Sequence, residues 1–127
     1  MRVDSLSSPM DVVADAGESL TDVASRMRFN DVGCVAVIEH GTLVGILTER
    51  DLVRAVADGN DFEKLVVADY MTPEPVAVSP ETDAREAGRV MVQAGIRHLP
   101  VVENDRLLGV MSMRDIVVEL IQGGDEF

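Results

Sequence analysis

Two short stretches of the sequence carry a hydroxyl, an arginine and a carboxylate at the same spacing. The first reads Gly45-Ile-Leu-Thr-Glu-Arg-Asp51 and the second reads Gly109-Val-Met-Ser-Met-Arg-Asp115. Each follows aliphatic residues and precedes a helical pattern, which predicts a strand that leads into a helix. Thr48 and Ser112 would cap these helices, and the two aspartates would lie in their first turns. Free backbone amides at such a helix start favour an anion.

Each stretch taken alone is also a capping box, a pattern that marks only the start of a helix. Two copies with matching glycine, hydroxyl, arginine and aspartate are a more specific signal than one. A shift of 64 residues, which superimposes the two motifs, also aligns the rest of the chain without a gap, for example Pro9 with Pro73. The sequence therefore predicts a duplicated domain with pseudo-twofold symmetry, with repeat one at 1–60 and repeat two at 61–127.

Each repeat is predicted to follow the order β-α-β-β-α, an α/β (α+β) fold. An irregular lead-in (3–11 and 67–75) opens into a short extended segment (12–14 and 76–78). A helix follows, capped by Ser19 in repeat one and by Asp83 in repeat two. Two strands joined by a tight turn then lead through the motif into the last helix, which ends at Gly59 or Gly123. The remaining expectations are a linker at 58–64 and a frayed tail at 123–127.

The composition limits the class of protein. Apolar residues make up 46% of the chain, but aromatic residues only 3%, so the core must be aliphatic. The net charge of −12 argues against nucleic acid as a partner. No apolar run has the length of a membrane span, and a single Cys34 allows no internal disulfide. We expect a cytoplasmic protein without membrane contact.

Acidic residues outnumber basic ones by 23 to 11, and Lys64 is the only lysine. Acidic surfaces of this kind keep a protein soluble in concentrated salt, where charge repulsion is screened. The composition therefore favours a halophilic source, such as a halophilic archaeon. An acidic protein from an ordinary environment is the alternative.

The duplicated motif, with the string Val67-Ala-Asp-Tyr-Met-Thr-Pro73 and the string Gly95-Ile-Arg-His-Leu-Pro-Val-Val102, resembles the CBS domain (cystathionine β-synthase domain) family. Two such domains in tandem resemble the pair known as a Bateman module. The resemblance extends from Val3 to Ile121 and is closer in the second repeat. It implies two β-α-β-β-α repeats packed through their sheets.

The resemblance also implies a function. Such pairs commonly bind adenine nucleotides or S-adenosyl compounds in the cleft between the repeats, with Mg²⁺ as a candidate companion of ATP. The aspartate would hold ribose, the hydroxyl would approach phosphate, and apolar lead-in residues would surround the base. One predicted site consists of Ser112 and Asp115 with the lead-in from Met10 through Val12 and Val13. The other predicted site consists of Thr48, Asp51, Tyr70, Met71, Pro75 and Val76. Arg97 and His98 resemble the family's phosphate contacts and could serve either site. Pro100 and Arg114 are the remaining residues expected to bind the ligand.

Several of these residues have a structural alternative. Arg97 and Arg114 could pair with carboxylates, His98 could be a hydrogen-bonded residue at a strand end, and Tyr70 could pack on its own helix. Because Cys34 replaces His98 in repeat one, we expect unequal sites. No catalytic triad, phosphate loop or metal-ligand spacing is present in the sequence, so we expect no enzyme. The first hypothesis is a homodimeric regulatory module that signals to a partner protein, and the second is a ligand-free dimerisation scaffold.

Overall fold

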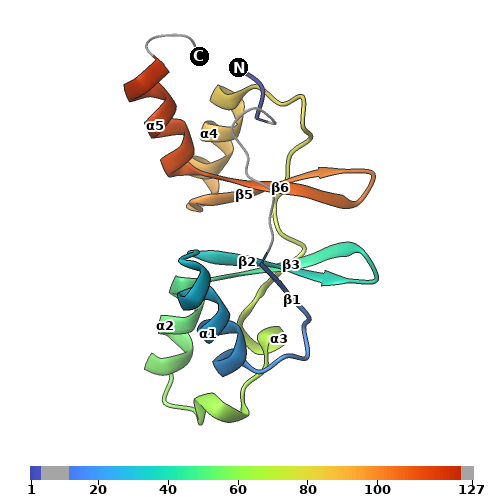
Figure 1. The fold of residues 1–127 in the computed structure, drawn as a ribbon, viewed down its shortest axis with the longest axis vertical. Helices are drawn as coiled ribbons and strands as arrows, with labels where there is room; N and C mark the ends of the chain where they lie inside the picture. The colour runs from blue at the N-terminus through green and yellow to red at the C-terminus, as the bar shows by residue number, and fades with distance from the viewer. Residues whose placement is uncertain (4–11, 124–127) are drawn as a thin grey trace. The chain divides into compact units, whose positions relative to one another are not determined.

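The computed structural model describes residues 1–3 and 12–123 of the chain. These residues form two compact units, one over Asp11–Pro75 and the other over Met1–Met10 with Val76–Phe127 (Figure 1). The compact units thus divide the chain near Asp11 and Pro75, whereas the sequence repeat predicts a boundary near residue 60. The first is called the unit of repeat one, and the second is called the unit of repeat two.

The unit of repeat one is built on a four-stranded sheet in the order β1-β2-β3-β4. β1 pairs with β2 in parallel, and the other neighbours are antiparallel. Its buried core is aliphatic and includes Leu20, Val23, Met27 and Leu47. The elements are β1 (Val13–Ala14), α1 (Leu20–Asn30), β2 (Cys34–Glu39), β3 (Thr42–Thr48), α2 (Glu49–Ala57), η2 (Phe62–Lys64), α3 (Val67–Tyr70) and β4 (Thr72–Pro73).

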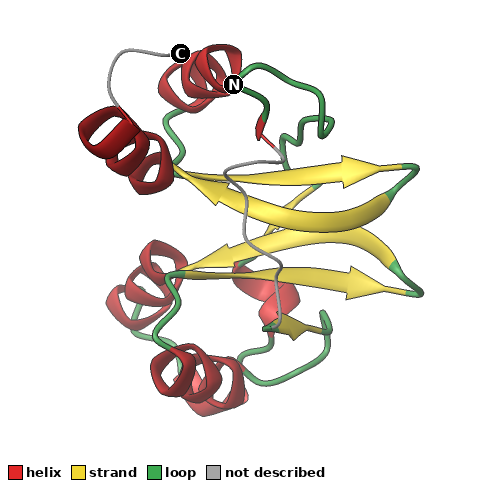
Figure 2. Cartoon of the chain, turned by 45° about the horizontal axis from the view of Figure 1, so that its top comes forward, coloured by secondary structure: helices red, strands yellow, loops and turns green. Residues whose placement is uncertain are grey.

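The unit of repeat two contains a two-stranded antiparallel sheet, β5-β6. Its elements are α4 (Ala84–Ala94), β5 (His98–Glu103), β6 (Arg106–Ser112) and α5 (Met113–Gly123). Its core includes Val3, Met91, Leu99 and Met111, which are all fully buried. In both units the longer helices lie on one face of the sheet (Figure 2), as the apolar periodicity of the helices predicts.

The predicted helix starts and hairpin turns are confirmed, whereas α2 ends at Ala57, two residues before the predicted Gly59. Ser19 caps α1 and Asp83 caps α4, each through a side-chain oxygen that accepts a backbone N–H. The hairpin turns contain left-handed residues, with φ of 51° at His40 and 53° at Asn104. Such positive φ values match the twist of the flanking strands, so the turn residues set the register of both hairpins.

Two details of the lead-ins differ from the prediction. The lead-in 67–75 is not irregular, because it forms α3 and β4. The segment 76–78 makes only an isolated parallel bridge, between Val78 and Val101, instead of a strand. The lead-in 4–11 and the tail 124–127 lie outside the described residues, while Gly123 is the last residue of α5.

Each described lead-in segment packs on the helix start of the other repeat. The N–H of Val67 donates to the carbonyl of Glu18, and Val67 is fully buried in the core of repeat one. At the equivalent position, the N–H of Val3 donates to the carbonyl of Thr82, and Val3 is buried in the core of repeat two. This exchange explains why the compact units differ from the sequence repeats.

Candidate functional site

The first motif lies at the junction of β3 and α2, and its hydroxyl and carboxylate bind each other. The N–H of Thr48 donates to Asp51 Oδ2 at 2.8 Å, and Thr48 Oγ1 contacts the same oxygen at 3.1 Å. In return, the N–H of Asp51 donates to Thr48 Oγ1 at 3.3 Å. The predicted cap is therefore confirmed as a reciprocal capping box. Asp51 is the only buried charged residue in the described part of the chain, at 7% exposure.

The second motif repeats this arrangement at the junction of β6 and α5. The N–H of Ser112 donates to Asp115 Oδ2 at 2.8 Å, and the N–H of Asp115 donates to Ser112 Oγ at 3.1 Å. Asp115 is partly buried. Both carboxylates thus lie in the first turn of a helix.

The free amides expected at these helix starts are partly used within the chain. The N–H of Glu49, the first residue of α2, donates to the carbonyl of Gly33 at 3.0 Å. The N–H of Met113, the first residue of α5, donates to the carbonyl of Arg97 at 2.8 Å. Since the aspartate N–H binds the hydroxyl, the first and third amides of each helix are satisfied. Fewer backbone amides are therefore available to an anion than the sequence predicts. The carboxylate becomes the more important group of each motif for binding a ligand.

Arg54, which the sequence analysis did not consider, contacts the first motif. Its Nη2 donates to Asp51 Oδ1 at 2.8 Å and to the carbonyl oxygen of Tyr70 at 3.2 Å. Its Cζ lies 5.6 Å from the centre of the Tyr70 ring, within cation–π range. The hydroxyl of Tyr70 in turn donates to Asp58 Oδ2 at 2.6 Å. Arg54 therefore links α2 to α3 and binds the Asp51 oxygen that the capping box leaves available.

The second motif lacks this cation. Aligning the two motifs places Val118 of α5 opposite Arg54 of α2, and the described residues form no ion pair with Asp115. Arg54 and Val118 each follow the motif aspartate by three residues, a spacing at which side chains on a helix are neighbours. This difference between the repeats is the sequence signal that could have identified Arg54. Arg114, the arginine inside the second motif, is exposed and makes no ion pair with a described carboxylate.

Met71 and β4 lie against β3 at the start of the first motif. A Cβ atom added to Gly45 would stand 2.6 Å from Met71 Sδ and 3.1 Å from the carbonyl oxygen of Thr72. A larger residue would require Met71 and the backbone of β4 to shift, so this close approach favours the glycine at the head of the motif. Pro73 pairs with Gly45 on the edge strand β4, where a missing N–H is tolerated. Pro75, the last residue of this unit, is partly buried.

The predicted phosphate contacts belong to the unit of repeat two, near the second motif. His98 begins β5 and is the sheet partner of Ser112. Arg97 is exposed, makes no ion pair with a described carboxylate, and is tied to α5 through its carbonyl. Pro100 is buried in β5, where its carbonyl accepts the N–H of Val78. The structure thus brings Arg97 and His98 together with Ser112 and Asp115 in one unit.

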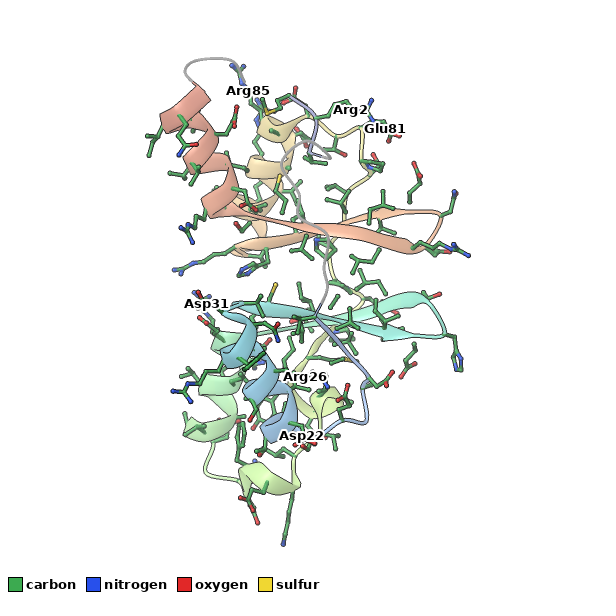
Figure 3. The ribbon with its side chains drawn as sticks, viewed as in Figure 1. Arg2, Asp22, Arg26, Asp31, Glu81 and Arg85 are labelled. Atoms are coloured by element: carbon green, nitrogen blue, oxygen red, sulfur yellow. The ribbon has the colours of Figure 1, made fainter. Side chains whose placement is uncertain are left out.

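The remaining predicted residues lie in β1 and after β4. Val12 is 8% exposed and belongs to the core of repeat one, whereas Val13 is 42% exposed. Arg26, which is labelled in Figure 3, donates from Nη2 to the carbonyl of Val13 at 2.8 Å. Its Nη1 lies 2.6 Å from Glu18 Oε2. Val76 is exposed and is the first residue of the second segment in the unit of repeat two. Met10 lies outside the described residues.

Cys34 and Tyr70 have shifted pKa values. Burial raises the pKa of the Cys34 thiol to about 12, so this cysteine is an inert, uncharged group at neutral pH. The pKa of Tyr70 is raised because its hydroxyl donates to the Asp58 carboxylate. Neither shift provides a nucleophile or a general base near neutrality. The described residues include no cluster of histidine, cysteine and acid fit to hold a metal ion, and none of their helices is long and apolar enough to cross a membrane.

Comparison with known proteins identifies the family. The model of the CBS domain matches residues 3–58 and residues 67–122. The chain therefore belongs to the CBS domain family and carries two CBS domains in tandem, each with the β-α-β-β-α order. CBS domain-containing protein YhcV of Bacillus subtilis is 34% identical over 102 residues, which cover 80% of this chain and 72% of YhcV.

A second relative and a solved structure are also similar to this chain. Uncharacterized protein MK0525 of Methanopyrus kandleri is 35% identical over 103 residues, which cover 79% of this chain but only 53% of that protein. The crystal structure of the CBS domain pair of protein MJ0100, in complex with 5′-methylthioadenosine and S-adenosyl-L-methionine, has a TM-score of 0.88. It is 23% identical, with 98% of each chain covered, and this likeness shows the fold.

Proposed function

We propose that this chain is a non-catalytic regulatory module that binds an adenosyl ligand at its strand-to-helix motifs and signals to a partner protein. The ligand would be an adenine nucleotide or an S-adenosyl compound. The observation that carries the proposal is the duplicated motif, in which a carboxylate is fixed beside a hydroxyl at a helix start. A carboxylate accepts hydrogen bonds from paired ribose hydroxyls, and a hydroxyl donates to phosphate.

The second motif carries the larger set of suitable groups. Asp115 Oδ2 is fixed by the N–H of Ser112, and no described residue donates to Oδ1, which would accept a ribose hydroxyl. Arg97 and His98 lie in the same unit and would supply positive charge for phosphate. The related fold of the MJ0100 domain pair, crystallised with two adenosyl compounds, supports this class of ligand.

The net charge of −12 opposes binding of a polyanion at low salt. Concentrated salt would reduce this repulsion, since the Debye length falls to roughly 3 Å at 1 M. The acidic, lysine-poor composition therefore leads us to propose that the protein works in concentrated salt, as halophilic proteins do. A ligand with less negative charge than ATP, such as an S-adenosyl compound, would suffer less from the repulsion, and Mg²⁺ would offset it for ATP.

A dimerisation scaffold is the second candidate function, and exposed helix faces support it. Val53 and Val56 of α2 are each about two-thirds exposed, at 66% and 65%. In α5, Val117, Leu120 and Ile121 are exposed at 44%, 47% and 77%. Their three- and four-residue spacing places them on one helix face, as in a helix that packs on a partner. We propose that the regulatory module forms a homodimer through such faces, and under the scaffold hypothesis this is its entire function.

Isothermal titration calorimetry in molar KCl tests the ligand hypothesis. The probes are S-adenosylmethionine, 5′-methylthioadenosine, AMP, ADP and ATP, the last with and without Mg²⁺. We expect binding of at least one probe, and we expect Asp115→Asn to weaken it at least tenfold, because the amide lacks the charge and one acceptor. A tenfold change corresponds to about 1.4 kcal/mol.

Asp83→Asn is the matched control. Asp83 caps α4 in the same unit through Arg85 N, but it lies outside the motif, at the helix end marked by Arg85 in Figure 3. It should leave the affinity unchanged, because asparagine is also a good N-cap. A cooperatively melting protein that binds none of the probes would reject the ligand hypothesis and favour the scaffold.

A further inference from the structure

We infer that Arg54 is a specificity-determining residue that makes the two motifs unequal: it binds Asp51 in place of a ligand, so that the motif of Asp115 binds the adenosyl ligand first and more tightly. The inference rests on the proposed function, because it concerns which carboxylate receives the ligand. It requires only contacts within each unit.

The polar atoms of Asp51 are occupied by the chain itself. Oδ2 accepts from Thr48, and Oδ1 accepts from Arg54 Nη2 at 2.8 Å. The carboxylate side chain is only 10% exposed, while the Arg54 side chain remains 56% exposed. A ribose hydroxyl directed at Oδ1 would therefore compete with a guanidinium that covers this oxygen at the protein surface.

Displacing Arg54 would break more than one interaction. The same Nη2 also donates to the Tyr70 carbonyl, and the guanidinium lies over the Tyr70 ring. Hydrogen bonds to a charged group are stronger than neutral ones, although exposure of the arginine reduces the net effect. The arrangement also engages Tyr70, whose hydroxyl is held by Asp58 and whose ring would otherwise be the candidate for stacking on adenine. We therefore expect a competing contact that weakens ligand binding without abolishing it.

The second motif offers the comparison that isolates the effect. Asp115 has the same bond from the residue at the cap, but the equivalent of Arg54 is Val118. Valine cannot donate to Oδ1, and no other described residue does so, so a ligand meets no competitor there from the described part of the chain. Among the described residues, the exchange of Arg54 for Val118 is thus the difference that acts on Oδ1, and this position can be swapped between the motifs.

Reciprocal substitutions test the inference by calorimetry with the adenosyl probe that the wild type binds best. The wild type should show one tight event per chain and a second at least tenfold weaker. Arg54→Val should strengthen the weaker event at least tenfold, and adding Asp51→Asn to that variant should remove the gain. Val118→Arg should weaken the tight event at least tenfold, because arginine three residues after Asp115 can repeat the Arg54 contact. Circular dichroism melting establishes that each variant is folded.

Arg28→Val is the matched control for the loss of one positive charge. Arg28 is an exposed residue of α1 and forms no ion pair with a described carboxylate, so both binding events should remain as in the wild type. If Arg28→Val strengthens the weaker event as much as Arg54→Val does, net charge accounts for the effect and the inference is wrong.

The other outcomes separate the inference from the proposed function. Two events of equal affinity in the wild type, or an unchanged weak event in Arg54→Val, would overturn the role of Arg54 and leave the proposed function standing. A weaker second event in Arg54→Val would show that the guanidinium holds the ligand, which also overturns the inference. Absence of binding in the wild type and in every variant would overturn the proposed function and this inference with it.

Discussion

The units of repeat one and repeat two share a fold but differ in the ion pairs and hydrogen bonds that their side chains form. In repeat one, two arginines form ion pairs and also join separate elements. Arg54 pairs with Asp51 of the same helix and donates to the carbonyl of Tyr70 in α3. Arg26 of α1 pairs with Glu18 and donates to the carbonyl of Val13 in β1. Aligning the repeats places Val118 and Val90 opposite these two arginines. The two helices and the hairpin thus do not need the ion pairs, since the second copy forms α4, β5, β6 and α5 without them. Burial of aliphatic side chains is what the two units have in common.

The largest expected effect follows from the exchanged lead-ins. Val67→Ala should destabilise the unit of repeat one by about 1.5–3 kcal/mol, although Val67 belongs to repeat two in the sequence, because its fully buried side chain lies in the other repeat's core. Val3→Ala should act on the unit of repeat two by a similar amount. Hydrogen exchange measured by mass spectrometry should show lost protection in 12–75 for the first variant and in 84–123 for the second. Loss of protection in the variant's own repeat instead would contradict the exchange.

A second prediction concerns the glycine at the head of the first motif. Gly45→Ala should cost about 1–3 kcal/mol, because the new Cβ would lie 2.6 Å from Met71 Sδ and 3.1 Å from a backbone carbonyl. Adding Met71→Ala should recover part of the strain but not all, since the carbonyl of Thr72 is part of the paired strand β4. Urea denaturation of the single and double variants measures this coupling. A Gly45→Ala protein as stable as the wild type would show that β4 can move away without cost.

Removing the hydroxyl caps compares the two motifs directly. Thr48→Ala and Ser112→Ala should each lower the free energy of unfolding by about 0.5–2 kcal/mol, because each exposes the aspartate N–H. Thr48→Ala should cost more, since its hydroxyl also contacts Asp51 Oδ2 at 3.1 Å, a contact not found between Ser112 and Asp115 among the described residues. Thermal denaturation followed by circular dichroism gives the comparison. The larger loss in Ser112→Ala would reverse the ranking and show that the extra contact adds nothing.

Much of this architecture could be predicted from the sequence, because the signals were local and repeated. The caps Ser19, Asp83, Thr48 and Ser112 are short-range features, and two copies reinforced each other. The exchange of lead-ins could not be predicted, because nothing local distinguishes Val67 in its own repeat's core from Val67 in the other's. Arg54 was missed for a different reason. The site residues were predicted from positions that the repeats share, and Arg54 aligns with Val118, a position where they differ. This difference alters the candidate site, because Arg54 binds Asp51.

The sole tyrosine gives a pH test of the contacts around the first motif. The chain has one tyrosine and no tryptophan, so ultraviolet absorbance of tyrosinate reports Tyr70 alone. Its pKa should lie above the ordinary value of 10.0, chiefly because the hydroxyl donates to Asp58. Asp58→Asn should lower that pKa. Since the folded pKa is raised, the bond stabilises the fold fully below pH 10 and is lost as the pH rises through the folded pKa. An identical titration in Asp58→Asn would show that this bond does not form in solution.

The smallest predicted effect lies at the acid end, where it again separates the two units. The Arg26 hydrogen bond lowers the pKa of Glu18, so this pair stabilises repeat one above the ordinary glutamate pKa of 4.5 and is lost as the pH falls through the folded pKa. The equivalent position in repeat two has Thr82, whose hydroxyl lies 3.2 Å from that of Ser79 and does not titrate in this range. Because Arg26 is 40% exposed, the pair should contribute less than about 1 kcal/mol. Hydrogen exchange should be measured at pH values on either side of the Glu18 transition. In the wild type, acidification should reduce protection slightly more in 12–30 than in 76–94. Arg26→Val, which introduces the residue found in repeat two, should abolish that difference. If the difference persists in Arg26→Val, acid sensitivity arises from the wider acidic surface and not from this ion pair.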